Sequence, residues 1–119
     1  MARFRLSKPA ELDIATILRT SEQRWGIPAS ARYAALLAKA MHAIAADPVG
    51  PLTRPLPKLR GGIRRFHTRH ARGAKARVNA PVHVILYRIA DPELIEIVRV
   101  VHERMEPSAH LPTKPPRRQ

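Results

Sequence analysis

Two runs of branched and aromatic residues in the C-terminal half constrain the fold of this chain most strongly. Residues 82–89 read Val-His-Val-Ile-Leu-Tyr-Arg-Ile, and residues 94–101 read Leu-Ile-Glu-Ile-Val-Arg-Val-Val. Both compositions favour β-strands, and the intervening Ala90-Asp91-Pro92 predicts a turn. A third strand, richer in charge, is expected over residues 63–70. Three consecutive strands favour an antiparallel meander.

The N-terminal half predicts a short strand followed by a helical hairpin. Residues 3–7 alternate polar and apolar side chains, which is the period of a half-buried strand. Ser7 is expected to cap a first helix that stops at Gly26, and a second helix is expected between Pro28 and Asp47. The apolar stripes comprise Ile14, Ile17, Leu18, Ser21 and Trp25 on the first helix and Tyr33, Leu37, Ala40, Met41 and Ile44 on the second. We expect both Trp25 and Tyr33 to pack within the hairpin.

The remaining segments have no periodic pattern. Residues 48–57, with four prolines, predict a stiff connector, and residues 71–81 predict a long, basic, mobile hairpin loop. Residues 103–111 are expected to form one or two helical turns. The predicted class is α+β with the order β-α-α-β-β-β-α, as a single domain over residues 1–111 followed by a basic, proline-rich flexible tail over residues 112–119.

Several classes of site have no support in the sequence. There is no cysteine, so neither disulfides nor thiolate metal sites are expected. No phosphate-binding loop, dinucleotide fingerprint, zinc-protease motif or nucleophile elbow occurs, and we expect no cofactor. His67 and His70 would face opposite sides of a strand, so we expect no shared metal site. No apolar segment has the length of a signal peptide or membrane span, which predicts a soluble, cytoplasmic protein without a membrane partner.

The positive charge is concentrated in the middle of the chain. The sequence has 22 Lys and Arg against 9 Asp and Glu, a formal net charge of +13. Residues 48–90 contain ten of the basic residues and none of the acidic ones. The positive electrostatic field of this segment favours an anionic partner, either nucleic acid or an acidic protein surface. A solvated basic face that keeps the protein soluble is the simpler alternative. The candidate target-binding residues of this segment are Arg60, Arg64, Arg65, Arg69, Arg72, Lys75 and Arg77.

Arg99 interrupts the last predicted strand, on the face that it shares with Ile97 and Val101. A charge on an apolar face needs a partner or an open groove. A structural salt bridge to Glu96 or Glu93 and a functional role are both open.

His83 and Tyr87 share one face of the preceding strand. They would suit an acid–base pair beside a ligand. Burial in a small core is the alternative, and we favour it for Tyr87.

The order of elements and several short strings resemble the ParE toxins of the RelE/ParE superfamily, the toxic halves of bacterial type II toxin–antitoxin modules. The strings are residues 5–14 (RLSKPAELDI), Trp25-Gly26, Tyr33, Asp47-Pro48, residues 59–66 (LRGGIRRF), residues 83–88 (HVILYR) and residues 95–105 (IEIVRVVHERM). The resemblance spans roughly residues 3–111. It implies a small, twisted, mostly antiparallel sheet that residues 3–7 join at an edge, with the helical hairpin on one face.

The resemblance also implies partners and two alternative activities. ParE-like members poison DNA gyrase and are neutralised by a ParD-type antitoxin, a ribbon-helix-helix protein with an acidic tail. RelE-like members cleave ribosome-bound mRNA with sheet Lys and Arg residues and a C-terminal tyrosine or histidine. In this chain Arg64, Arg65 and Arg99 would hold phosphate and His102 would transfer protons.

The segment 103–119 contains no tyrosine, which favours the ParE branch and a binding toxin over an enzyme. Arg99 and Arg104 then join the candidate target-binding residues. A non-toxic nucleic-acid-binding module is a third hypothesis, weakened by the lack of exposed aromatic residues expected for stacking. Residues 71–81 depart from the family, whose members have a short turn there, so the target itself is open.

Overall fold

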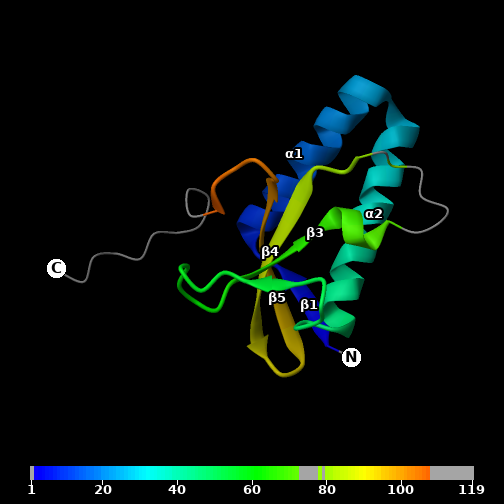
Figure 1. The fold of residues 1–119 in the computed structure, drawn as a ribbon. Helices are drawn as coiled ribbons and strands as arrows, with labels where there is room; N and C mark the ends of the chain where they lie inside the picture. The colour runs from blue at the N-terminus through cyan, green and yellow to red at the C-terminus, as the bar shows by residue number, and fades with distance from the viewer. Residues whose placement is uncertain (1, 73–77, 79, 108–119) are drawn as a thin grey trace.

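The computed structural model describes residues 2–72, 78 and 80–107, and it consists of two helices packed against a five-stranded sheet (Figure 1). The elements in chain order are β1 (Arg3–Leu6), α1 (Lys8–Trp25), α2 (Ile27–Ala46), β2 (Arg54–Pro55), β3 (Arg64–His67), a 3₁₀ turn (Thr68–Ala71), β4 (His83–Asp91) and β5 (Leu94–His102). The predicted α+β class is confirmed. Within the described residues, no helix is long and apolar enough to cross a membrane.

The strands of the sheet lie in the order β1-β5-β4-β3-β2. β3, β4 and β5 form the predicted antiparallel meander, and β1 joins the edge beside β5 in parallel orientation. The strand at the opposite edge was not predicted. It is β2, a strand of two residues within the segment that the sequence predicted as a connector, and it pairs with β3. A strand this short has no periodicity for sequence analysis to detect.

The helical hairpin begins and ends where the sequence predicts. The Ser7 hydroxyl accepts a hydrogen bond from the backbone N–H of Ala10 and so caps α1. Gly26, with φ of 93°, provides the turn into α2, a conformation that residues with a β-carbon rarely adopt. α2 buries Leu36, Leu37, Ala40, Met41, Ile44 and Ala45, which include four of the five residues in its predicted stripe.

The prediction for Trp25 is wrong, because this side chain is 72% exposed. Trp25 is the last residue of α1, and the end of α1 lies at the tip of the hairpin, beyond the sheet (Figure 1). Periodicity places a residue on a face of its helix but does not reveal where the opposing surface ends. Tyr33, in the second turn of α2, is half-buried and packs against the core.

The core has one cluster on each face of the sheet. Between the sheet and the helices lies the larger cluster, which includes Leu37, Ile44, Phe66, Ile85, Tyr87, Ile95, Ile97 and Val100. On the opposite face, the loop before β3 supplies Leu56, Leu59 and Ile63, which pack with Val84, Leu86, Val98 and Val101. Tyr87 is fully buried and its hydroxyl donates to the carbonyl of Pro48 at 2.5 Å, which confirms the core interpretation of this residue.

β5 contains a bulge that sequence analysis missed. Leu86 pairs with Arg99 whereas Tyr87 pairs with Ile97, so Val98 is an extra residue. A bulge of one residue inverts the alternation of side chains beyond it. Ile97 and Val100 therefore belong to the helix-side cluster and Val101 to the other, so the predicted face shared by Arg99, Ile97 and Val101 does not exist.

Three predicted segments lie partly or wholly outside the described residues. Of the loop at residues 71–81, only 71–72, 78 and 80–81 are described. Of residues 103–111, the structure describes residues 103–107, which form turns after β5. The predicted tail at residues 112–119 lies outside, so its boundary with the domain stays a prediction.

Candidate functional site

Three arginines gather at the edge of the sheet formed by β2 and β3, and we call Arg54, Arg65 and Arg69 the edge arginines. Arg54 and Arg65 lie directly opposite each other in the ladder, and directly opposed side chains share one face. The pKa of the neighbouring His70 is lowered, first by partial burial and then by the positive charges of Arg69, His67, Arg65 and Arg54. Among the described residues none of the edge arginines forms an ion pair. Their shared field is therefore available to an anion.

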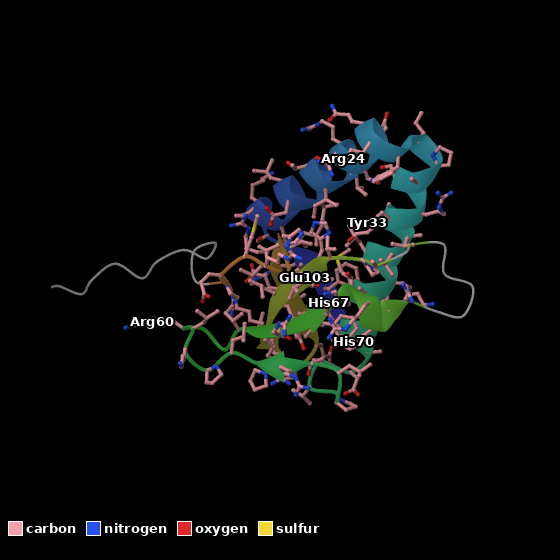
Figure 2. The ribbon with its side chains drawn as sticks, turned by 45° about the horizontal axis from the view of Figure 1, so that its top comes forward. Arg24, Tyr33, Arg60, His67, His70 and Glu103 are labelled. Atoms are coloured by element: carbon pink, nitrogen blue, oxygen red, sulfur yellow. The ribbon has the colours of Figure 1, made fainter. Side chains whose placement is uncertain are left out.

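The structure disperses the predicted target-binding residues over several surfaces. Arg65 and Arg69 belong to the edge arginines, whereas Arg60 projects from a turn well away from His70 (Figure 2). Arg72 donates to the carbonyl of Val78 at 3.3 Å, and Arg104 is exposed after β5. Lys75 and Arg77 lie outside the described residues. Arg54 was missed, because only its pairing with Arg65 distinguishes it from other exposed basic residues of the connector.

Arg64 and Arg65 are consecutive residues of one strand and face opposite sides of the sheet. Arg64 pairs with Tyr87, whose side chain lies in the helix-side cluster, while Arg65 pairs with Leu86 of the other cluster. The guanidinium of Arg64 donates through Nη2 to the hydroxyl of the buried Thr53 at 2.7 Å. The two arginines therefore do not form one phosphate-binding pair.

Arg99 forms a structural ion pair with Asp13 of α1, and not with Glu93 or Glu96 as the sequence suggested. Its Nε and Nη2 atoms donate to the two carboxylate oxygens of Asp13 at 2.7 and 2.8 Å, which also raises the pKa of Arg99. The same carboxylate accepts the backbone N–H of Val100 at 2.9 Å. Asp13 therefore accepts a backbone hydrogen bond of β5 beside the bulge. Glu96 instead pairs with Arg88 at 2.7 Å and with Arg5 at 3.7 Å.

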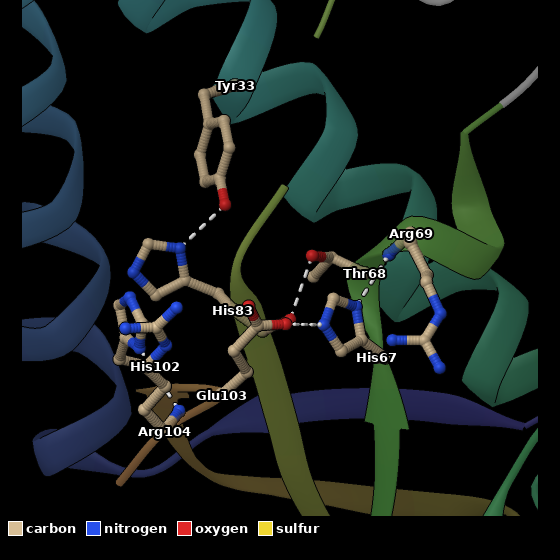
Figure 3. A network of polar contacts seen from close by, with 8 residues as sticks. All are labelled: Tyr33, His67, Thr68, Arg69, His83, His102, Glu103 and Arg104. Atoms are coloured by element: carbon tan, nitrogen blue, oxygen red, sulfur yellow. Dashed lines mark hydrogen bonds and ion pairs between the residues drawn. The ribbon is translucent and has the colours of Figure 1, made fainter. Parts of the chain in front are cut away.

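A network of polar side chains connects the ends of β3, β4 and β5 (Figure 3). His67, only 4% exposed, accepts the N–H of Arg69 at Nδ1, so its Nε2 donates to Glu103 at 2.6 Å. This contact lowers the pKa of Glu103. The hydroxyl of Thr68 donates to the carbonyl of His83 at 2.8 Å. The network fixes the point where the chain leaves β5.

His83 and His102 lie directly opposite each other on β4 and β5, with ring centroids 6.0 Å apart. The Nδ1 atom of His83 lies 2.6 Å from the hydroxyl of Tyr33, and burial raises the pKa of this tyrosine. Burial and the positive charges of His102 and His67 lower the pKa of His83 to about 4. His83 is therefore neutral at pH 7, when Nδ1 accepts the hydroxyl proton of Tyr33.

We predict that acid destabilises the fold through His83. The unfolded imidazole takes up a proton near the ordinary histidine pKa of 6.5, whereas the folded one resists until about pH 4, so the unfolding free energy falls as the pH drops through this window. The expected loss between pH 7 and 5 is roughly 1 kcal/mol, reduced by partial solvent exposure. Urea unfolding across this range should give a flatter profile for His83→Asn. An unchanged slope would show that other groups carry the pH dependence.

The described histidines are not placed to form a metal centre. His67 lies at the end of β3 and His70 lies in the 3₁₀ turn rather than on a strand, with ring centroids 6.4 Å apart. Within the described residues there is no group of three or more potential ligands placed to hold a metal ion.

Comparison with known proteins gives consistent matches along the chain. The family model described as "ParE toxin of type II toxin-antitoxin system, parDE" matches residues 4–107. Toxin ParE1 of Caulobacter vibrioides is 37% identical over 111 residues, covering 93% of this chain and 99% of the relative. Toxin ParE1 of Mycobacterium tuberculosis is 27% identical over 110 residues, covering 92% of this chain and 98% of the relative. The resemblance carried by the short sequence strings is confirmed over the hairpin and the sheet.

Proposed function

Because this chain belongs to the ParE toxin family of type II toxin–antitoxin systems, we propose that it inhibits DNA gyrase and is neutralised by a ParD-type antitoxin. It acts by binding to the gyrase–DNA complex and stalling it on cleaved DNA. This is a stoichiometric inhibition that needs no catalytic residue and no cofactor in the toxin.

The observation that carries the proposal is the set of edge arginines. Arg54 and Arg65 face the same side, Arg69 lies close by, and none of the three has a carboxylate partner among the described residues. Guanidinium groups bind phosphate through paired N–H donors. Each phosphate that they neutralise releases counterions and strengthens association. The edge arginines therefore suit the DNA held by gyrase.

The proposal is tested with purified proteins. Gyrase supercoiling activity should fall as the toxin approaches the gyrase concentration, and gyrase-cleaved DNA should accumulate. Addition of the antitoxin at a molar equivalent should restore supercoiling. Unchanged supercoiling at a tenfold excess of correctly folded toxin would contradict gyrase as the target.

A second candidate, cleavage of mRNA, is favoured by the opposed pair of His83 and His102. Two imidazoles on one strand pair resemble the acid and the base that cleavage through a 2′-hydroxyl requires. The phosphate-binding half of that site is not assembled. Arg64 pairs with Tyr87 of β4, whereas His102 pairs with His83, four residues away on the same strand. Four residues span about 13 Å at the rise of a β-strand. Arg99 is bound to Asp13.

We predict that His102→Ala leaves toxicity within about twofold of the parent, because binding to gyrase uses no proton transfer. Growth after induction and primer extension on ribosome-bound mRNA measure the two activities side by side. Discrete cleavage sites that disappear in His102→Ala would establish the nuclease. A DNA-damage response without such sites is the result expected of a gyrase inhibitor.

A further inference from the structure

Trp25 is the aromatic side chain that the fold leaves outside the core, at the hairpin tip (residues 22–30). All five aromatic residues of the chain lie within the described part. The other four pack in the helix-side cluster or against it, and they are Phe4, Tyr33, Phe66 and Tyr87. Trp25 is 72% exposed, and Ile27, two residues further along, is 69% exposed. Exposure of an indole beside an aliphatic side chain is unfavourable in water, and such a pair commonly marks a binding surface.

Hydrogen bonds connect the two helices at the hairpin tip. The N–H of Gly26 donates to the carbonyl of Glu22 at 2.8 Å, and the N–H of Ser30 donates to the carbonyl of Gly26 at 3.2 Å. The hydroxyl of Ser30 also donates to the carbonyl of Leu18 at 2.9 Å and so ties α2 to α1. A ligand that contacts Trp25 therefore meets a preorganised backbone, which reduces the entropy lost on binding.

The side chains around Trp25 match the chemistry of a nucleotide. Arg24, the preceding residue, is exposed and forms no ion pair with a described carboxylate, and it lies near the end of the hairpin that is away from the sheet (Figure 2). A nucleotide presents the flat face of its base close to a phosphate. An indole stacks on the base, and a guanidinium binds the phosphate.

The charges at the hairpin tip nearly cancel, because Glu22 is also exposed one turn before Trp25. Stacking rather than charge therefore supplies most of the binding at this point. The formal net charge of +13 attracts a polyanion to the protein as a whole. An apolar pocket of another protein would also fit an exposed tryptophan, but the charge of the chain favours a nucleic acid.

Only bases that are not stacked within a duplex can bind in this way. In an intact duplex the neighbouring base pairs cover each base face, and their separation is costly. Single strands, gaps and broken ends leave base faces open to an aromatic side chain. The ligand class is therefore DNA with unpaired bases.

We propose that the hairpin tip is a nucleobase-binding site, in which Trp25 stacks on an unpaired base and Arg24 contacts an adjacent phosphate. An expected lack of exposed aromatic residues weakened nucleic-acid binding as a hypothesis, and Trp25 supplies such a residue. The site goes beyond the proposed function, because it requires no gyrase. It is also separate from the edge arginines, which belong to β2, β3 and the 3₁₀ turn.

The fluorescence of Trp25 reports on this site directly, because the chain has a single tryptophan. The unaltered chain is titrated with a single strand of DNA, with a duplex that contains a single-stranded gap, and with an intact duplex of the same length. The emission should fall to about half or less with the first two, as bases stack on the indole, and stay nearly constant with the third. Constant emission with all three, or equal quenching by all three, would overturn the proposal.

Substitutions at the hairpin tip separate stacking from general apolar contact. Trp25→Ala should weaken binding to the single strand about tenfold, and Trp25→Phe, which keeps an aromatic face, less than about threefold. The matched control is Ile27→Ala, which removes an exposed apolar side chain without an aromatic face and should change the affinity less than about twofold. The effect of Trp25→Ala should be the same at low and high salt, because stacking releases no counterions. Equal losses for Trp25→Ala and Ile27→Ala would overturn stacking as the mode of binding.

The same fluorescence signal distinguishes the other partners. Emission that changes with purified gyrase, but not with DNA alone, would assign the hairpin tip to a protein pocket and overturn the inference. Emission that changes with the concentration of the chain alone, and not with DNA, would assign it to a second copy and overturn it equally. Quenching by single-stranded DNA supports the site even if gyrase proves not to be the target, so this test is independent of the proposed function.

Discussion

Charge reversal at Arg54 and Arg65 is expected to abolish growth inhibition while leaving the complex with the antitoxin intact. The two residues are directly opposed across β2 and β3 and have no ion pair among the described residues. Two carboxylates at these positions would repel the phosphates that the arginines attract. We expect at least a hundredfold loss of gyrase inhibition, of the order reached when several charges reverse at one interface. Titration of supercoiling activity measures it.

The matched control is charge reversal at Arg19 and Arg32, which are exposed on α1 and α2. It changes the net charge of the protein by the same amount but leaves the sheet edge unaltered. Thermal unfolding confirms that each variant is folded. If both double variants lose activity equally, net charge rather than the edge arginines determines binding. If neither variant loses activity, the basic segment is a solvated face that serves solubility.

Asp13→Ala is expected to reduce the unfolding free energy by about 3 kcal/mol. The substitution removes the carboxylate that accepts hydrogen bonds from the guanidinium of Arg99 and from the N–H of Val100. The side chains of Asp13 and Arg99 are largely shielded from solvent, at 15% and 23% exposed. Removal of one member of such a pair costs more than the pair contributes. Urea unfolding at pH 7 gives the value.

Glu11→Ala serves as the comparison, because Glu11 forms only an exposed pair with Lys8 at 3.4 Å. It should cost less than about 1 kcal/mol. The double variant Asp13→Leu with Arg99→Met replaces the ion pair by apolar contacts and should recover most of the loss. An Asp13→Ala variant as stable as Glu11→Ala would show that the contact is not rigid in solution.

The sequence predicted the elements that have a strong local signal. Ser7 and Gly26 carry the capping chemistry of α1, and the dense runs of branched residues in β4 and β5 favour strands. These signals were sufficient to predict the α+β class, the helical hairpin and the order of the strands in the meander.

The features that the sequence did not reveal depend on distant residues. The partner of Arg99 lies 86 positions away at Asp13, and the bulge at Val98 is visible only once β4 is placed beside it. The same holds for the site, because Arg54 gains its significance from Arg65 across the ladder. Local charge density identified a basic segment but could not sort its arginines by the face of the sheet that they occupy.

Because β1 pairs with β5, the sheet can be completed only late in the synthesis of the described residues. Arg3 pairs with Leu94, and Ser7 binds the backbone of Ile97 and Val98. During translation the first strand therefore has no partner strand until β5 has been made. A chain interrupted before Leu94 would lack Ile95, Ile97 and Val100 of the helix-side cluster. The apolar surface exposed in this way leads to aggregation or degradation. Only a chain that has been extended through β5 can complete the sheet.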